Sequence, residues 1–218
     1  MNQDKYQAYL AKCIIFMIRD YQDDGDILEF LDALSFSIGM MVNSDRVVNW
    51  LDIAGICDQR YYSLKYVKNE PTKLNTKLLS TCENKVNKFL DKVSDGTPDD
   101  VLPDYTKMIK TSQKQKNEYQ ALLAKDIIGM IRNYQDNDKI LDYLNSIAFC
   151  TAAMLGNNGI VDWFDIAKAC DKSGSAALNE KFLISCERQA QKYAPKGTQW
   201  QRALSVKTAS TASNATSP

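Results

Sequence analysis

The 218-residue sequence predicts an all-α protein, a tandem duplication of a roughly four-helix antiparallel bundle. Residues 6–58 align with residues 119–171 at a constant offset of 113, without a gap, and 26 of the 53 pairs are identical. A second block, 74–89, matches 178–193 at an offset of 104. Apolar residues recur at three- and four-residue steps in both copies, which is the period of an amphipathic helix.

Each copy is expected to hold four helices in the same order. In the first copy they are expected at about 6–21, 26–42, 45–57 and 72–92. In the second copy they are expected to begin near 119 and to continue at about 138–155, 159–170 and 176–193. Asp23 or Asp24 is a suitable N-cap for the second helix. The third helices carry Trp50 and Trp163 with identical flanks, and we expect both indoles in the core.

The chain divides into four expected segments. Residues 1–93 form the first helical copy, and residues 94–117 form a linker that extends the first helix of the second copy backwards. Residues 118–194 form the second copy, and residues 195–218 form a polar, mostly disordered tail. Two similar copies in one chain also suggest a pseudo-twofold packing of one copy against the other.

Two cysteine pairs recur between the copies, Cys57 with Cys170 and Cys82 with Cys186. They predict one structural disulfide per copy, Cys57–Cys82 and Cys170–Cys186, which would stabilise modules this small. Such bridges imply a periplasmic or secreted protein. The alternative is a set of reduced, buried thiols on helices, which fits a cytoplasmic protein.

Two further cysteines, Cys13 and Cys150, have no counterpart in the other copy, and the sequence leaves their state open. It also leaves open a signal peptide removed before the first residue. No stretch of 18 apolar residues exists, so no membrane span is expected.

The composition argues against catalysis. The sequence has no histidine, which removes serine–histidine, cysteine–histidine and HExxH chemistry. No cysteine spacing fits a zinc site, so we expect neither a metal nor a cofactor. Because 27 basic residues balance 27 acidic ones, no positive field points to nucleic acid.

Two acids sit in electrostatically unfavourable places. Asp58 and Asp171 lie at the ends of the third helices, where the helix dipole disfavours a negative charge. Arg19 and Arg132 lie on the otherwise apolar first helices and are candidate partners for these acids. We expect structural ion pairs here, with a ligand site as the alternative.

The segment after the first Cys-Asp pair is specific to copy one. It is basic and aromatic, and it supplies the candidate partner-binding residues Arg60, Tyr61, Tyr62, Lys65 and Tyr66. Tyr and Arg are enriched in interface hot spots. The alternative is a short extra helix that packs its tyrosines over the bundle.

Together these features predict a non-catalytic protein that binds another protein, as an adaptor or a stoichiometric inhibitor. The immunity type of inhibitor is an analogy of architecture alone. One alternative is a carrier of a small hydrophobic ligand in the bundle interior, because the second helix of copy one is rich in soft side chains such as Met40 and Met41. The weakest is a carboxylate-based hydrolase using acids such as Asp52 and Asp165.

Overall fold

The computed structural model describes most of both copies. The described residues are 3–42, 46–67, 69, 71–94, 111–171 and 178–196. They form eight α-helices and a short 3-10 turn, and no strand occurs among them, so the all-α prediction is confirmed. Residues 95–110 of the expected linker and 197–218 of the expected tail lie outside the described part.

The helices follow the repeat. In the first copy they are α1 (Gln3–Asp20), α2 (Gly25–Val42), α3 (Trp50–Tyr66) and α4 (Thr76–Ser94). In the second copy they are α5 (Gln113–Asn133), α6 (Asp138–Leu155), η2 (Gly156–Asn158), α7 (Trp163–Cys170) and α8 (Glu180–Gln191). The helix α3 is about twice as long as α7, because the copy-specific segment after residue 57 continues as helix.

Equivalent side chains begin equivalent helices. The side chains of Asp24 and Asn137 each accept a hydrogen bond of 3.1 Å from a backbone N–H in the first turn of α2 and α6. Asn49 and Asp162 do the same for α3 and α7. These caps satisfy backbone donors that would otherwise lack partners. Asp24, one of the two expected caps, therefore holds that role.

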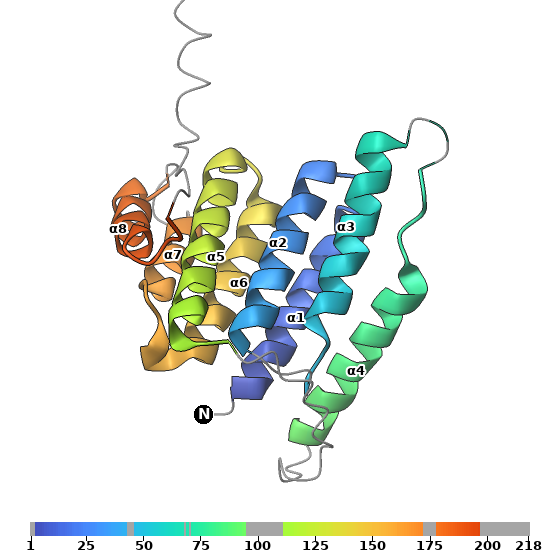
Figure 1. Cartoon of the computed structure of the whole chain (residues 1–218), viewed down its shortest axis with the longest axis horizontal. Coiled ribbons are helices and arrows are strands. Elements are labelled where there is room, and N and C mark those ends of the chain that lie inside the picture. The colour runs from blue at the N-terminus through green and yellow to red at the C-terminus, as the bar shows by residue number, and fades with distance from the viewer. Residues whose placement is uncertain are drawn as a thin grey trace, which may run out of the picture.

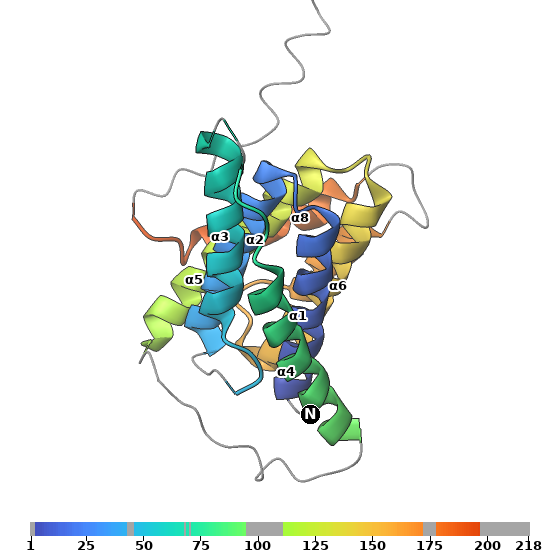
Figure 2. The ribbon, with the colours of Figure 1, turned by 90° about the vertical axis from the view of Figure 1, so that its right-hand side faces the viewer.

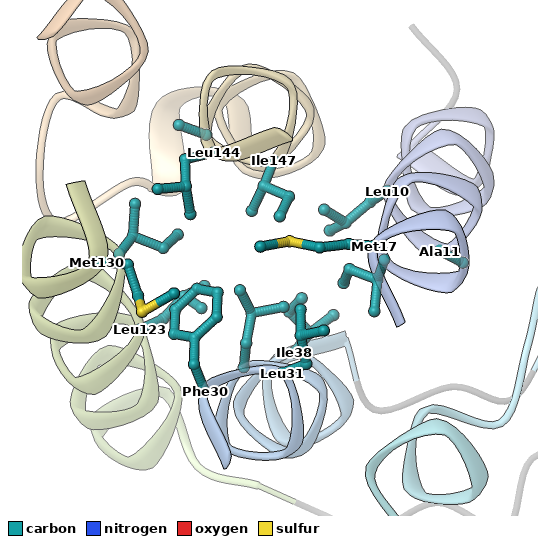
Figure 3. Close-up of a cluster of buried hydrophobic side chains, with 14 of the residues drawn as sticks. Leu10, Ala11, Met17, Phe30, Leu31, Ile38, Leu123, Met130, Leu144 and Ile147 are labelled. Carbon is teal, nitrogen blue, oxygen red and sulfur yellow. The ribbon is translucent and has the colours of Figure 1, made fainter. Parts of the chain in front are cut away.

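The centre of the molecule is a four-helix core to which both copies contribute. The helices α1, α2, α5 and α6 stand beside one another in Figure 1, with α1 packed mainly on α6, and α2 packed on α5 and on α3 of its own copy. By contrast, α1 and α2 touch each other little, and so do α5 and α6. Figure 3 shows apolar side chains from all four helices converging, among them Leu10, Met17, Leu31, Ile38, Leu123, Met130, Leu144 and Ile147.

The expected pair of separate antiparallel bundles is not confirmed. Each of α1 and α2 buries apolar surface against a helix of the opposite copy as well as against an outer helix of its own copy, α4 and α3 respectively, so neither copy encloses this core by itself. Exchanging the copies converts the α1–α6 pair into the α5–α2 pair, so both cross-copy contacts are made by equivalent helices.

The outer helices cover opposite sides of this core. The pair α3 and α4 lies on one side, and α7 and α8 lie on the other, while α4 crosses α1 (Figures 1 and 2). Trp50 and Trp163 are buried at the start of α3 and α7, which confirms their expected place in the core. At Gly39 the backbones of α2 and α3 approach closely, since a Cβ there would lie 2.9 Å from the Cβ of Trp50.

The two expected disulfides are not formed. Cys57, Cys82, Cys170 and Cys186 are all free thiols, buried between helices. In copy two the Sγ of Cys170 donates to the carbonyl of its own helix four residues earlier at 3.5 Å, and the Sγ of Cys186 donates to the carbonyl of Asp162 at 3.4 Å. All four are therefore small buried residues without a disulfide, which was the alternative interpretation, and the two thiols of copy two also hydrogen-bond to the backbone.

A candidate binding groove between the two copies

The contact of α1 with α6 leaves a groove of about 730 Å³ on the surface, which we call the α1–α6 groove. Its lining from α1 is Tyr6, Tyr9, Lys12, Cys13 and Phe16. Its lining from α6 is Lys139, Asp142, Tyr143, Asn145, Ser146, Phe149 and Cys150. The groove exists because helices from different copies pair, so sequence reasoning that kept the copies apart could not find it.

Large aromatic side chains are exposed in this groove. Tyr9 and Phe16 are 43% and 40% exposed on α1, and Phe149 is 49% exposed on α6. Phe164 of α7 lies edge-on to Phe149, with 5.7 Å between ring centroids, and is exposed as well. A cluster of exposed aromatic rings rimmed by polar residues is typical of an interaction site.

Two thiols contribute an apolar, uncharged part of the lining. Cys13 and Cys150 belong to different copies, and the α1–α6 contact brings both into the groove. Burial raises the pKa of Cys13 to about 12, with a further contribution from Cys150, and burial raises the pKa of Cys150 to about 11. Both remain protonated at neutral pH, which makes them poor nucleophiles and poor metal ligands. These are the cysteines whose state the sequence left open, and both are free.

One corner of the groove is fixed by a hydrogen-bonded acid. The Tyr143 hydroxyl donates to Asp20 at 2.5 Å, and the Lys139 Nζ lies 3.0 Å from the same carboxylate. These two contacts lower the pKa of Asp20. The Nζ of Lys12 lies 5.9 Å from the ring centroid of Phe16, within the range of a cation–π contact. The groove therefore combines neutral aromatic walls with lysines at its edge.

The expected ion pairs involve other acids. Arg19 binds Glu83 through two contacts of 2.8 and 2.5 Å, so that α1 is joined to α4. Arg132 binds Glu187 at 2.5 and 2.9 Å, so that α5 is joined to α8. Glu180 adds a third acid at 2.6 Å from Arg132. The contacts of the two arginines shown here are to these glutamates, whereas the sequence had suggested Asp58 and Asp171 as their partners.

Asp58 belongs to a small group of interacting acids around Asp32, which the sequence did not indicate. It adds to the raised pKa of Asp32, which reaches about 6 mainly through burial. Asp58 also contributes, after burial and Asp32, to the raised pKa of the Cys57 thiol. Within the described residues no cluster of three or more histidine, cysteine, aspartate or glutamate side chains is arranged to hold a metal ion.

The copy-specific segment divides into a structural part and an exposed part. Arg60 is buried, donates to the carbonyls of Gln22 at 2.9 Å and Thr72 at 2.7 Å, and binds Asp23. It therefore ties the turn between α1 and α2 to the segment before α4. Such an arginine is not available to a partner protein.

Three tyrosines of this segment lie on the last two turns of α3. Tyr61 packs against the core, and its hydroxyl accepts a hydrogen bond from Lys65. Tyr62 and Tyr66 are exposed, with ring centroids 4.7 Å apart. Contact of these residues with a partner stays a prediction, now limited to Tyr62, Lys65 and Tyr66.

The repeated acids Asp52 and Asp165 belong to different outer helix pairs. Asp52 lies on α3 and Asp165 on α7, at opposite sides of the core (Figure 1), and Asp165 binds Lys168 of its own helix at 3.1 Å. A hydrolase that used this pair would need both carboxylates within about 10 Å of each other.

Comparison of the chain with protein-family models, with curated proteins and with solved structures finds no match. Among the described helices, none combines the length and the apolar character needed to cross a membrane. Function must therefore be inferred from the groove and the exposed side chains themselves.

Proposed function

We propose that this is a non-catalytic binding protein whose α1–α6 groove receives an apolar segment of another protein. The observation that carries the proposal is the exposure of Tyr9, Phe16 and Phe149 around a single groove of about 730 Å³. Aromatic side chains are enriched in the buried cores of protein–protein interfaces, and hot spots are enriched in Trp, Tyr and Arg. The exposed Tyr62 and Tyr66 on α3 supply a second candidate contact.

The pKa values of the groove thiols favour binding over chemistry. A thiol nucleophile needs a lowered pKa, whereas Cys13 and Cys150 have raised values. The sequence also contains no histidine to activate a nucleophile. An adaptor or a stoichiometric inhibitor needs neither group, because it acts by occupying a surface of its partner.

A small hydrophobic ligand is the second candidate occupant. The groove volume falls within the range of about 300–1,000 Å³ that is typical of small-molecule sites. This ligand would lie on the surface between α1 and α6, because apolar side chains occupy the space between the four core helices. The periplasmic or secreted location, and with it the immunity analogy, rested on the expected disulfides, so we propose no compartment.

Aromatic truncation in the groove tests the proposal, with a matched control on the opposite side. We expect Phe16→Ala with Phe149→Ala to reduce partner recovery from the native host by about tenfold or more, the size of one hot spot. Phe36→Ala removes an equally exposed ring at the position equivalent to Phe149 and should leave recovery unchanged. Equal recovery with the double variant and the wild type, measured by quantitative mass spectrometry, would refute the proposal.

A further inference from the structure

Because the sequence is repeated, the groove can be compared with the equivalent positions on the other two core helices. Each lining residue has a counterpart 113 positions away, on α5 or α2, and these two helices pack together as α1 and α6 do. We call this surface the α2–α5 face. It consists of Tyr119, Leu122, Lys125, Asp126, Gly129, Asp26, Glu29, Phe30, Asp32, Ala33, Phe36 and Ser37, of which Phe30 and Ser37 are buried and the others are exposed or half-buried.

The two surfaces keep aromatic residues at three equivalent positions and differ at others. Phe36 and Tyr119 lie edge-on with 6.0 Å between centroids, at the positions equivalent to Phe149 and Tyr6. Two exposed rings of the groove have no aromatic equivalent on the α2–α5 face, because Tyr9 corresponds to leucine and Phe16 to glycine. Divergence from a common surface has therefore left the larger aromatic site on the α1–α6 side.

The charges of the two surfaces have opposite sign. The groove lining carries two lysines and one aspartate, a net charge of +1. The α2–α5 face carries one lysine and four acids, a net charge of −3. The acid Asp32 corresponds to Asn145 in the groove, and Asp126 corresponds to Cys13.

Neighbouring charges preserve this contrast. Asp20 beside the groove is bound by Lys139 and Tyr143, and it offsets the charge of Lys139, so the positive charge of this region rests on Lys12 and on Lys5 beside it. Lys5 is exposed, with its Nζ 5.9 Å from the ring centroid of Tyr9, and the residue at the same offset in copy two is Glu118. Lysines thus stand over the exposed rings of the groove, where an incoming segment would meet them.

The length of the groove limits the length of a partner helix that can lie along it. Its lining on α1 runs from Tyr6 to Phe16, which lie ten positions apart, or about 15 Å along the helix at 1.5 Å per residue. That distance matches three turns of a second helix lying along it. A helix of this length presents three apolar anchors at i, i+4 and i+7 to a groove.

We infer that the partner segment is an acidic amphipathic helix of about three turns, with apolar anchors between the aromatic walls and carboxylates toward Lys5 and Lys12. This inference rests on the proposed function and specifies its occupant. Carboxylates at these positions complement the lysines, while a basic helix would be repelled. The α2–α5 face, with four acids, is the surface that such a helix avoids.

Two synthetic peptides of about 12 residues test the inference with the full-length chain. Both carry leucine and phenylalanine at the three anchor positions, and they differ only in having glutamate or lysine at the flanking positions. Fluorescence anisotropy measures their dissociation constants at about 50 mM and about 500 mM salt. We expect the glutamate peptide to bind about tenfold more tightly at low salt, with the difference shrinking to about twofold at high salt.

Charge reversal at equivalent lysines supplies the control. Lys12→Glu should remove the preference for the glutamate peptide, and Lys125→Glu, its counterpart 113 residues away on α5, should leave it unchanged. Equal binding of the two peptides, or tighter binding of the lysine peptide, overturns the inference while the proposed function stands. If neither peptide binds, and Phe16→Ala with Phe149→Ala leaves partner recovery unchanged, the proposed function fails as well.

Two other outcomes would assign another occupant and also overturn the inference. Self-association of the chain that is lost in both Lys12→Glu and Asp126→Lys would identify the acidic α2–α5 face of a second copy as the occupant. Binding of an uncharged hydrophobic dye in the groove, with no binding of either peptide and with loss in the Phe16→Ala and Phe149→Ala variant, would indicate a small ligand.

Discussion

The two arginine–glutamate pairs offer the same substitution at equivalent positions with different burial. The side chain of Arg132 is 7% exposed and binds Glu187 and Glu180, whereas the side chain of Arg19 is 36% exposed and binds Glu83 alone. Removing one partner of a buried pair costs about 3–5 kcal/mol, while an exposed pair contributes about 1 kcal/mol or less. Truncation to alanine should therefore destabilise the protein unequally.

We expect Arg132→Ala to lower the free energy of unfolding by about 2–3 kcal/mol, less than the full buried value. The reason is that Glu187 and Glu180 are 22% and 37% exposed and can be hydrated once the arginine is gone. Arg19→Ala should cost about 1 kcal/mol. At about 2–4 °C per kcal/mol for a chain of this size, the melting temperatures should fall by about 5–10 °C and about 2–4 °C.

Thermal and urea unfolding followed by circular dichroism measure both variants. Arg132→Lys keeps the charge but loses the forked geometry that reaches two glutamates, so it should recover only part of the loss. Equal destabilisation by Arg132→Ala and Arg19→Ala, or a larger effect of Arg19→Ala, would refute the reasoning from burial.

Two further stability predictions concern single sites. Burial raises the pKa of Asp126 to about 6, above its ordinary 3.8, so the folded state binds the proton more tightly and the ionised carboxylate costs stability. Asp126→Asn should raise the free energy of unfolding by about 1–2 kcal/mol at pH 7.5. This advantage over the wild type should vanish as the pH falls through 6 toward 4. Urea unfolding at several pH values measures it, and a difference between variant and wild type that stays constant across this range would contradict the prediction. Gly39→Ala should destabilise the protein by about 1–3 kcal/mol because the new Cβ would meet Trp50. Gly129→Ala has open space around it and should stabilise the protein by about 0.5–1 kcal/mol. Similar melting temperatures for the two variants would contradict the close approach of the helices at Gly39.

Much of the local structure was predictable because its causes lie close together in the sequence. The period of apolar residues places the helices, and Asp24 begins α2 as a short polar side chain at an N-cap should. The burial of Trp50 and Trp163 also follows, since a large aromatic side chain kept with its neighbours in both copies is most often part of a core.

The pairing of α1 with α6 was not predictable from these patterns. An apolar stripe predicts that a helix face is buried, but in a duplicated chain it does not indicate which copy covers that face. The α1–α6 groove depends on that pairing, so its two walls lie more than 100 residues apart in the sequence. One usable signal was present, because Tyr9 and Phe16 are outward-facing rings that copy two replaces with smaller residues.

The repeated cysteines and the repeated arginines each allowed more than one interpretation. Cysteines at matched positions fit a buried thiol as well as a disulfide, so the recurrence of Cys57 and Cys82 did not distinguish the two. For the arginines, the better signal was the recurrence of Glu83 as Glu187 in the second block, which the geometry makes the acid partner of Arg19 and Arg132 respectively.

Cutting the chain between the copies tests most directly whether they share one core. A protease site introduced between residues 95 and 110 allows the purified, folded protein to be cleaved into two pieces, which are then analysed by size-exclusion chromatography with light scattering. The pieces should stay together as one particle of unchanged mass and separate only in denaturant, because part of the apolar surface of α1 and α2 is buried against α6 and α5 of the other piece. Separation of the cleaved halves into two folded monomers in native buffer would contradict the shared core and, with it, the groove between α1 and α6.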